Sequence, residues 1–230
     1  MRVQSFAVAA VLTSWSAAPA AGQTIPSAYR FIETRQEAGM FAGWVAPGTG
    51  QFGFGPGPGP IIGARYGIGL RGPVSLEGVL GWIPTTRDVV DPRRQPGERV
   101  RGDADATLLQ IDARLKFSIT GQRTWHALNP FLLAGIGVAR DLAGESPLEE
   151  TEGLDQSDRF RFRMALVGSF GGGISWFLSE QWIARIDGLL HIWRLKVPNG
   201  FRDPERGFEA VGESEWVNAH GLSFGVGYRF

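Results

Sequence analysis

Charged side chains stand at every second position within otherwise apolar segments of this 230-residue sequence. Between residues 109 and 119, for example, Asp112, Arg114 and Lys116 alternate with aliphatic residues. Successive side chains point to opposite faces of a β-strand, so each such segment would gather its charges on one face. Guanidinium, ammonium and carboxylate groups brought together in this way form ion pairs, bind charged solutes or transfer protons.

Eleven residues fall on the charged face of the alternating segments. They are Arg65, Glu77, Asp112, Arg114, Lys116, Arg161, Arg163, Arg185, Asp187, His191 and Arg229. Seven are Lys or Arg and three are acids, so pairing within this set is incomplete. We therefore expect an ionic network that includes water, because a dry cluster with unpaired ions would be costly.

The sequence indicates neither a metal site nor a cofactor site. It contains no Cys, which excludes thiolate zinc sites, Cys nucleophiles and disulfides. Its histidines, His126, His191 and His220, are too scattered to form a metal cluster. The Gly- and Pro-rich stretch 48–60 predicts a loop, and no helix pattern follows it that would make it a phosphate cradle.

Composition narrows the class of protein further. The chain has 23 Lys and Arg against 23 Asp and Glu, and this neutrality argues against a nucleic-acid partner. Hydrophobic residues make up 43% and charged residues 20%, which excludes a disordered chain. Glycine supplies 33 residues, about twice the usual share of roughly 7%. The fold must use small residues repeatedly.

Residues 1–22 have the pattern of a secretory signal peptide. Arg2 gives a basic start, residues 6–18 are apolar or weakly polar, and small residues crowd positions 17–22. We therefore expect an exported protein whose signal peptide is cleaved. Residues 23–36 would then form a periplasmic N-terminal segment before the folded domain at 37–230.

Strict alternation of large apolar with small or polar residues continues along the folded domain. In the last segment, Leu222, Phe224, Val226 and Tyr228 alternate with residues that are mostly glycine. Eight such segments follow one another, and their connections alternate between short and long. The expected strands lie near 38–46, 62–70, 76–82, 109–119, 132–139, 160–176, 182–192 and 221–230. The first of them could face either way.

This pattern predicts an all-β fold, an eight-stranded antiparallel up-and-down transmembrane β-barrel. The apolar side chains would face lipid, where no backbone group can be left without a hydrogen bond, so the sheet must close. Eight strands leave an interior that side chains can fill, and glycines make room for the long charged ones. Aromatic residues near the strand ends predict interfacial belts. These residues are Trp44, Trp82, Phe160, Phe162, Trp176 and Trp182.

Two stretches resemble a known family. The segment 129–137 (NPFLLAGIG) and the closing segment 224–230 (FGVGYRF) are similar to those of the small outer-membrane β-barrel superfamily, the transmembrane domains like OmpA, OmpX and OmpW. The resemblance implies the bacterial outer membrane as location, with membrane lipid and lipopolysaccharide as surroundings, and a monomer. It also implies that Phe224, Tyr228 and Phe230 form the signal read by the barrel-assembly machinery. The peptidoglycan-binding role of OmpA is not expected here.

Three functions remain compatible with this fold. We expect a non-enzymatic outer-membrane protein with long extracellular loops and a structural or surface-interaction role. A narrow channel for small or apolar solutes is the first alternative. A lipid A deacylase is the second, because such barrels use a His-x-Ser pair; here, however, His191 is followed two residues later by Trp193.

The third long loop is acidic, with no basic residue between Arg140 and Arg159. Its acids are Glu145, Glu149, Glu150, Glu152, Asp155 and Asp158. Divalent-cation bridging to lipopolysaccharide phosphates is one interpretation. A solvated surface loop is the interpretation that we favour.

Overall fold

The computed structural model describes residues 27–230 except 34, 163 and 209. The predicted signal peptide, residues 1–22, lies outside the described residues. The strands are β1 (Tyr29–Phe31), β2 (Gln36–Pro47), β3 (Gly59–Gly69), β4 (Val74–Val90), β5 (Val100–Ser118), β6 (Arg123–Trp125), β7 (Leu128–Asp141), β8 (Met164–Phe177), β9 (Trp182–Lys196) and β10 (Ser214–Arg229). The helical turns are α1 (Pro147–Thr151) and the 3-10 turns η1 (Asn199–Arg202) and η2 (Pro204–Arg206).

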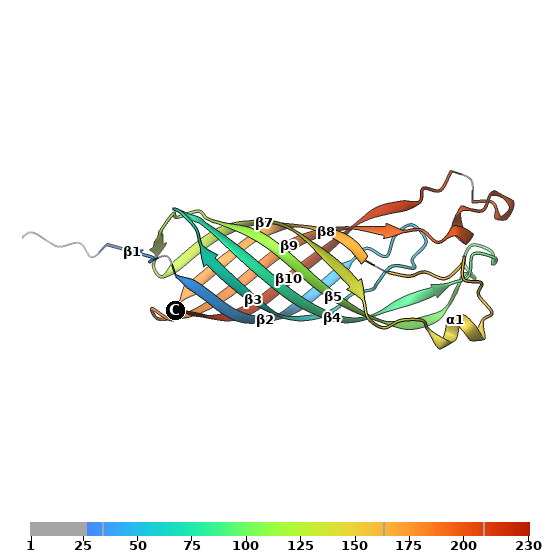
Figure 1. Cartoon of the computed structure of the whole chain (residues 1–230), viewed down its shortest axis with the longest axis horizontal. Coiled ribbons are helices and arrows are strands. Elements are labelled where there is room, and N and C mark those ends of the chain that lie inside the picture. The colour runs from blue at the N-terminus through green and yellow to red at the C-terminus, as the bar shows by residue number, and fades with distance from the viewer. Residues whose placement is uncertain (1–26, 34, 163, 209) are drawn as a thin grey trace, which may run out of the picture.

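Eight long strands close into one antiparallel barrel (Figure 1). Each pairs with its neighbour in the order β2-β3-β4-β5-β7-β8-β9-β10, and β10 pairs back with β2. The short strands β1 and β6 pair with each other at the end where the short turns lie (Figure 1). The predicted fold class is therefore confirmed. Within the described part of the chain, no helix is long and apolar enough to cross a membrane.

The register of the pairing fixes the tilt of the strands. One continuous line of paired residues runs around the ring and returns to β2 ten residues beyond its start, from position 37 to position 47. This line is Glu37, Gly67, Glu77, Arg114, Gly135, Ser169, His191, Ala219 and Pro47. A stagger of ten over eight strands corresponds to a tilt of about 40°. The line climbs around the barrel, so Glu77, Arg114, Ser169 and His191 lie at successively higher levels of the lumen.

Apolar side chains cover the outside of the barrel, as the alternation predicts. On β10, Leu222, Phe224 and Val226 are 63%, 55% and 41% exposed. The strand whose facing the sequence left open, β2, turns Met40 and Trp44 outward and buries Phe41 and Val45. An outer surface of this kind is stable against hydrocarbon and not against water.

Strands β4 and β5 extend well beyond their predicted ranges. The sequence predicts strands near 76–82 and 109–119, with a long connection over 85–101 between them, whereas β4 continues to Val90 and β5 begins at Val100. The connecting loop is only residues 91–99. The prediction failed because polar residues such as Thr86 and Asp88 interrupt the apolar alternation there. A strand that rises beyond the membrane has no lipid to face, so its outer positions need not be apolar.

Glycines on the inner wall let backbones and long side chains approach. Gly135 on β7 pairs with Arg114 on β5, and a Cβ at Gly135 would lie 2.6 Å from Arg114 Cγ and 3.0 Å from Arg114 Cα. A Cβ at Gly188, which faces outward on β9, would meet no heavy atom within 4 Å.

We therefore expect Gly135→Ala to lower the free energy of unfolding by about 1–3 kcal/mol, because overpacking forces the neighbours to shift. The matched variant Gly188→Ala should be neutral or slightly stabilising. Urea unfolding in lipid vesicles, followed by tryptophan fluorescence, measures both. Equal costs for the two variants would contradict the packing argument.

Candidate functional site

The lower half of the lumen, towards the short turns, holds a compact group of ion pairs. Arg185 on β9 donates to both carboxylate oxygens of Glu77 on β4, at 2.5 and 3.1 Å. Lys116 Nζ on β5 lies 3.0 Å from Glu77 Oε1. The guanidinium of Arg185 also stacks on the Phe131 ring, 4.4 Å from its centroid. Both Glu77 and Arg185 are 2% exposed, so these protein groups, and not bulk water, compensate each charge.

Further pairs complete this lower group. Asp187 accepts from Arg185 Nε at 2.7 Å and from Arg65 Nη1 at 2.6 Å. Lys116 also approaches Glu37 Oε2 on β2, at 3.7 Å. Sequence reasoning missed Glu37 because the facing of its strand could not be assigned. Its inclusion balances the three cations of this group with three carboxylates.

A second polar group lies above the first. Asp112 accepts from Arg114 Nε at 3.1 Å and from Gln110 Nε2 at 2.7 Å. Ser169 Oγ lies 2.9 Å from His191 Nδ1 and 3.5 Å from Asp112 Oδ2. Gln110 and Ser169 are neutral members of this group. The predicted set of lumen residues left them out because it contained only charged residues and a histidine, although both residues stand at inward positions of the alternation. Strand geometry alone would have found them.

This second group contains a serine, a histidine and a carboxylate, but they are not arranged as a catalytic triad. The carboxylate of Asp112 contacts Ser169, Arg114 and Gln110, and no hydrogen bond joins it to His191 in the described structure. In a triad the carboxylate orients the histidine, and the histidine activates the serine. His191 is only 2% exposed, so its side chain does not face the surrounding lipid.

A small cavity separates the two polar groups. Its volume is about 20 Å³, and its walls include Arg65, Arg114, Asp187 and His191. Arg65 Nη2 has no hydrogen-bond partner in the described structure. A polar cavity of this volume has room for a single water molecule. Side chains therefore fill most of the lumen at this level.

Aromatic side chains from three loops fill the upper half of the lumen. Together with lumen-facing residues such as Trp193 and Leu195, they form one buried apolar cluster. We call the six loop phenylalanines the plug; they are Phe52, Phe54, Phe160, Phe162, Phe201 and Phe208. Phe201 is fully buried, and its ring centroid lies 4.9 Å from that of Phe52 and 5.6 Å from that of Phe54.

The prediction of an outward belt position for Phe160 and Phe162 is wrong. They are 4% and 6% exposed and belong to the plug. Strand β8 begins only at Met164, so the alternation of the strand does not apply to the residues before it. By contrast, Trp44, Trp82, Trp176 and Trp182 all face outward and are about half exposed.

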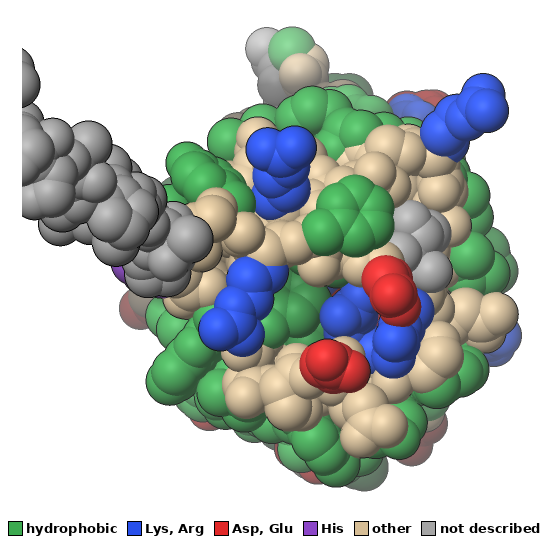
Figure 2. All heavy atoms as spheres, turned by 90° about the vertical axis from the view of Figure 1, so that its left-hand side faces the viewer, with side chains coloured by type: hydrophobic (Ala, Val, Ile, Leu, Met, Phe, Trp, Pro, Cys, Tyr) green, Lys and Arg blue, Asp and Glu red, His purple; other side chains and the backbone are tan. Residues whose placement is uncertain are grey.

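The prediction that Arg161 faces the lumen is also wrong, because it extended the alternation of β8 to residues before the strand begins. It lies before β8 and pairs with Glu145 of the third loop, outside the lumen. Arg163 is outside the described residues. Arg229 lies at the short-turn mouth of the lumen, where it donates to the backbone oxygens of Glu33 and Glu180 at 2.6 and 3.3 Å. Figure 2 shows this end, with charged side chains toward the middle and apolar ones around much of the rim.

The acids of the third loop are largely neutralised by arginines from other elements. Arg87 on β4 donates to Glu149 at 2.7 Å, and Arg101 on β5 pairs with Glu152 at 2.7 Å. The carboxylate of Asp158 is buried and pairs with Arg206 at 2.8 Å. The interpretation as a solvated loop is therefore wrong for Glu149 and Asp158. Within the described residues, no group of three or more His, Cys, Asp or Glu could hold a metal ion.

The carboxylate of Asp91, in the second long loop, shows how a neighbouring arginine stabilises a charged acid. Burial raises the pKa of Asp91, but hydrogen bonds and the positive charge of Arg93 lower it by more, so the net pKa lies below its ordinary value. Arg93 also donates to the backbone oxygens of Glu152 and Gly153. The second and third long loops are thus held together by an arginine between them.

The comparisons with known proteins agree with this architecture. No protein-family model and no curated protein matches the sequence. Among solved structures, Neisserial surface protein A is 14% identical with a TM-score of 0.52, over 85% of this chain and 97% of that one. The outer membrane protein OprG from Pseudomonas aeruginosa is 14% identical with a TM-score of 0.50, over 86% and 97%. This chain therefore has the fold of the small eight-stranded outer-membrane β-barrels.

Proposed function

We propose that this chain is a monomeric, non-enzymatic protein of the bacterial outer membrane with a closed lumen, which acts through its extracellular loops. The observation that carries this proposal is the filling of the lumen. Two polar groups close its lower and middle parts, and the plug closes its upper part. What remains available to other molecules is the outer surface and the loops that lie beyond the membrane.

The outer-membrane location is supported by the apolar outer face and by the outward tryptophans near two levels of the barrel. The signal peptide at residues 1–22 would export the chain. Phe224, Tyr228 and Phe230 on or beside β10 all face outward. That orientation is compatible with their recognition by the assembly machinery during insertion.

The absence of enzymatic activity is supported by the surroundings of His191. A lipid A deacylase needs its nucleophile and base at the lipid-facing surface, whereas His191 and Ser169 are 2% and 0% exposed inside the lumen. Trp193, which stands at the position of the expected nucleophile, is fully buried in the plug cluster. Mass spectrometry of lipid A with and without expression of the protein tests this: an altered acyl chain count would refute it.

We expect the protein to form no conducting pore. Reconstituted into a planar bilayer, it should give no current steps above the baseline, because the two polar groups and the plug fill most of the lumen. A porin reconstituted in parallel serves as the positive control. Reproducible small steps from samples that migrate as folded barrel would instead support the narrow-channel alternative.

A further inference from the structure

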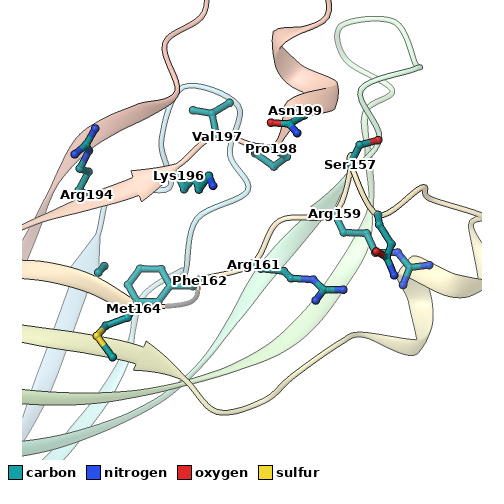
Figure 3. A pocket seen from close by; sticks show the side chains of 12 residues that line it. Ser157, Arg159, Arg161, Phe162, Met164, Arg194, Lys196, Val197, Pro198 and Asn199 are labelled. Atoms are coloured by element: carbon teal, nitrogen blue, oxygen red, sulfur yellow. The ribbon is translucent and has the colours of Figure 1, made fainter.

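A groove opens on the outside of the barrel at the rim where the long loops lie. It has a volume of about 330 Å³ and lies between the upper end of β9 and the segment that leads into β8 (Figure 3). Arg194 and Lys196 of β9 form one side, and Arg159 and Arg161 form the other. Neither polar group of the lumen contributes to it.

The groove exists because two neighbouring strands separate before they end. The ladder between β8 and β9 begins at the pair Val167–Trp193, although β8 starts at Met164 and β9 runs on to Lys196. The other edge of β9 stays paired with β10 as far as Ser214–Lys196. Backbone groups of residues 194–196 therefore border the groove without a ladder partner on the β8 side.

Positive charge dominates the groove. Four of its lining side chains are Arg or Lys, and no carboxylate lines it among the described residues. Glu145 neutralises part of the charge of Arg159 and Arg161 from outside the groove. Arg194 uses its Nε to bond Ser214 Oγ at 2.6 Å, and the ammonium of Lys196 forms no ion pair with any described residue.

Several acids of the third loop are already paired with arginines outside the groove. Three acidic side chains of the third loop, Glu149, Glu152 and Asp158, are paired with Arg87, Arg101 and Arg206. The exposed cations of β9, Arg194 and Lys196, can therefore pair with an anion from outside the chain.

The register places the groove just above the hydrocarbon layer. With strands tilted about 40°, each residue along a strand climbs about 2.5 Å, and each paired step from β2 toward β10 climbs about 3 Å. Counted in this way, Arg194 lies about 8 Å further out than Trp44 and Trp82. Lipid headgroups occupy roughly 5–8 Å beyond the hydrocarbon core, so the groove is at the depth of headgroup phosphates.

An apolar surface continues below the groove. Met164, which lines it, is 68% exposed, and Leu166, two residues further down the outside of β8, is 54% exposed. A lipid whose phosphate sits between Arg194 and Lys196 could therefore lay an acyl chain along this wall. A soluble anion would use only the charged part of the surface.

We propose that this groove binds the phosphate of a phosphorylated lipid in the outer leaflet. Arg194 and Lys196 provide the principal contacts, and Arg161 completes the cationic wall. Arginine is suited to this role because its guanidinium donates two parallel hydrogen bonds to phosphate oxygens. The inference rests on the proposed membrane location and adds a specific lipid contact to it.

The test compares Arg194→Gln/Lys196→Gln with the wild-type protein and with Arg71→Gln/Arg123→Gln. The control removes two exposed positive charges at the opposite rim. The probe is lipid A carrying both phosphates, and the same lipid without phosphates is measured in parallel, both with detergent-solubilised full-length protein. Each cation near an anionic lipid surface changes affinity by about five-fold, so the groove variant should bind about 25-fold more weakly. The control should bind like the wild type.

Several outcomes would overturn the proposal. The first is that the groove variant and the wild type bind lipid A with equal affinity. The second is that phosphorylated and dephosphorylated lipid bind equally well. The third is complete competition by inorganic phosphate at matched concentration, which would indicate a site for free anions. Shifted migration of unheated samples on gels, compared between the variants, shows whether each is a folded barrel. A wild-type protein that never shows this shift would refute the proposed function itself, whereas folded variants with unchanged affinity would refute only the groove.

Discussion

Replacing Glu77 with Gln should lower the free energy of unfolding by about 3–5 kcal/mol. The substitution keeps the shape of the side chain but removes the carboxylate that Arg185 and Lys116 share. Both cations would then be buried with incomplete compensation, since Arg185 keeps Asp187 and Lys116 keeps only the more distant Glu37. Urea unfolding in lipid vesicles measures the loss.

A matched control is Glu180→Gln, because Glu180 lies exposed in the short turn between β8 and β9. It should change the free energy of unfolding by less than about 0.5 kcal/mol. The double variant Glu77→Gln/Arg185→Gln should be more stable than the sum of the two single losses indicates, because each partner no longer leaves the other uncompensated. Strict additivity would show that the two groups do not interact as the geometry requires.

Replacing Phe201 with Ala should release the fourth loop from the lumen. Removing a fully buried phenylalanine costs about 3–5 kcal/mol, and here the cost falls on the plug that Phe201 forms with Phe52, Phe54 and Phe208. Cleavage by trypsin after Arg202 and Arg206 should accelerate about 100-fold or more, because proteolysis follows the population of the open loop. Mass spectrometry of the fragments identifies these sites.

Leu142→Ala is the control for this experiment, since Leu142 is 54% exposed at the start of the third loop. It should leave cleavage in the fourth loop unchanged. The barrel of the Phe201 variant should still migrate as a folded species on gels, because the ion pairs below the plug are untouched. A global loss of the folded species, with no selective cleavage, would show that plug and barrel unfold together.

Much of the barrel could be predicted because lipid imposes a simple rule on each strand. Leu222, Phe224 and Val226 face outward since alternation is strict wherever hydrocarbon surrounds the sheet. The rule fails where the membrane ends. Phe160 and Phe162 continue the alternation of β8 in sequence, yet they belong to a loop that turns into the lumen.

The charged residues of the lumen could also be predicted only in part. The sequence correctly predicts an inward orientation for Arg185, Glu77 and Asp187, because each lies within a strand whose alternation is clear. Their partners could not be named, since pairing depends on the stagger of the ring and on which strands face each other across it. Adding Glu37 and removing Arg161 halves the apparent excess of cations, and Arg229 is bound by backbone oxygens at the mouth of the lumen.

The ion pairs at the base of the lumen join segments that are far apart in the chain. Glu77 and Arg185 are separated by 108 residues, and Arg65 and Asp187 by 122. These two pairs cannot form in a partly assembled sheet, because β9 meets β3 and β4 only across a finished ring. During insertion, an incomplete sheet would carry incompletely compensated ions toward hydrocarbon, since only pairs within one strand or between adjacent strands could form. Insertion should therefore be cooperative, with the last strand closing the ring and neutralising the charges in the same step.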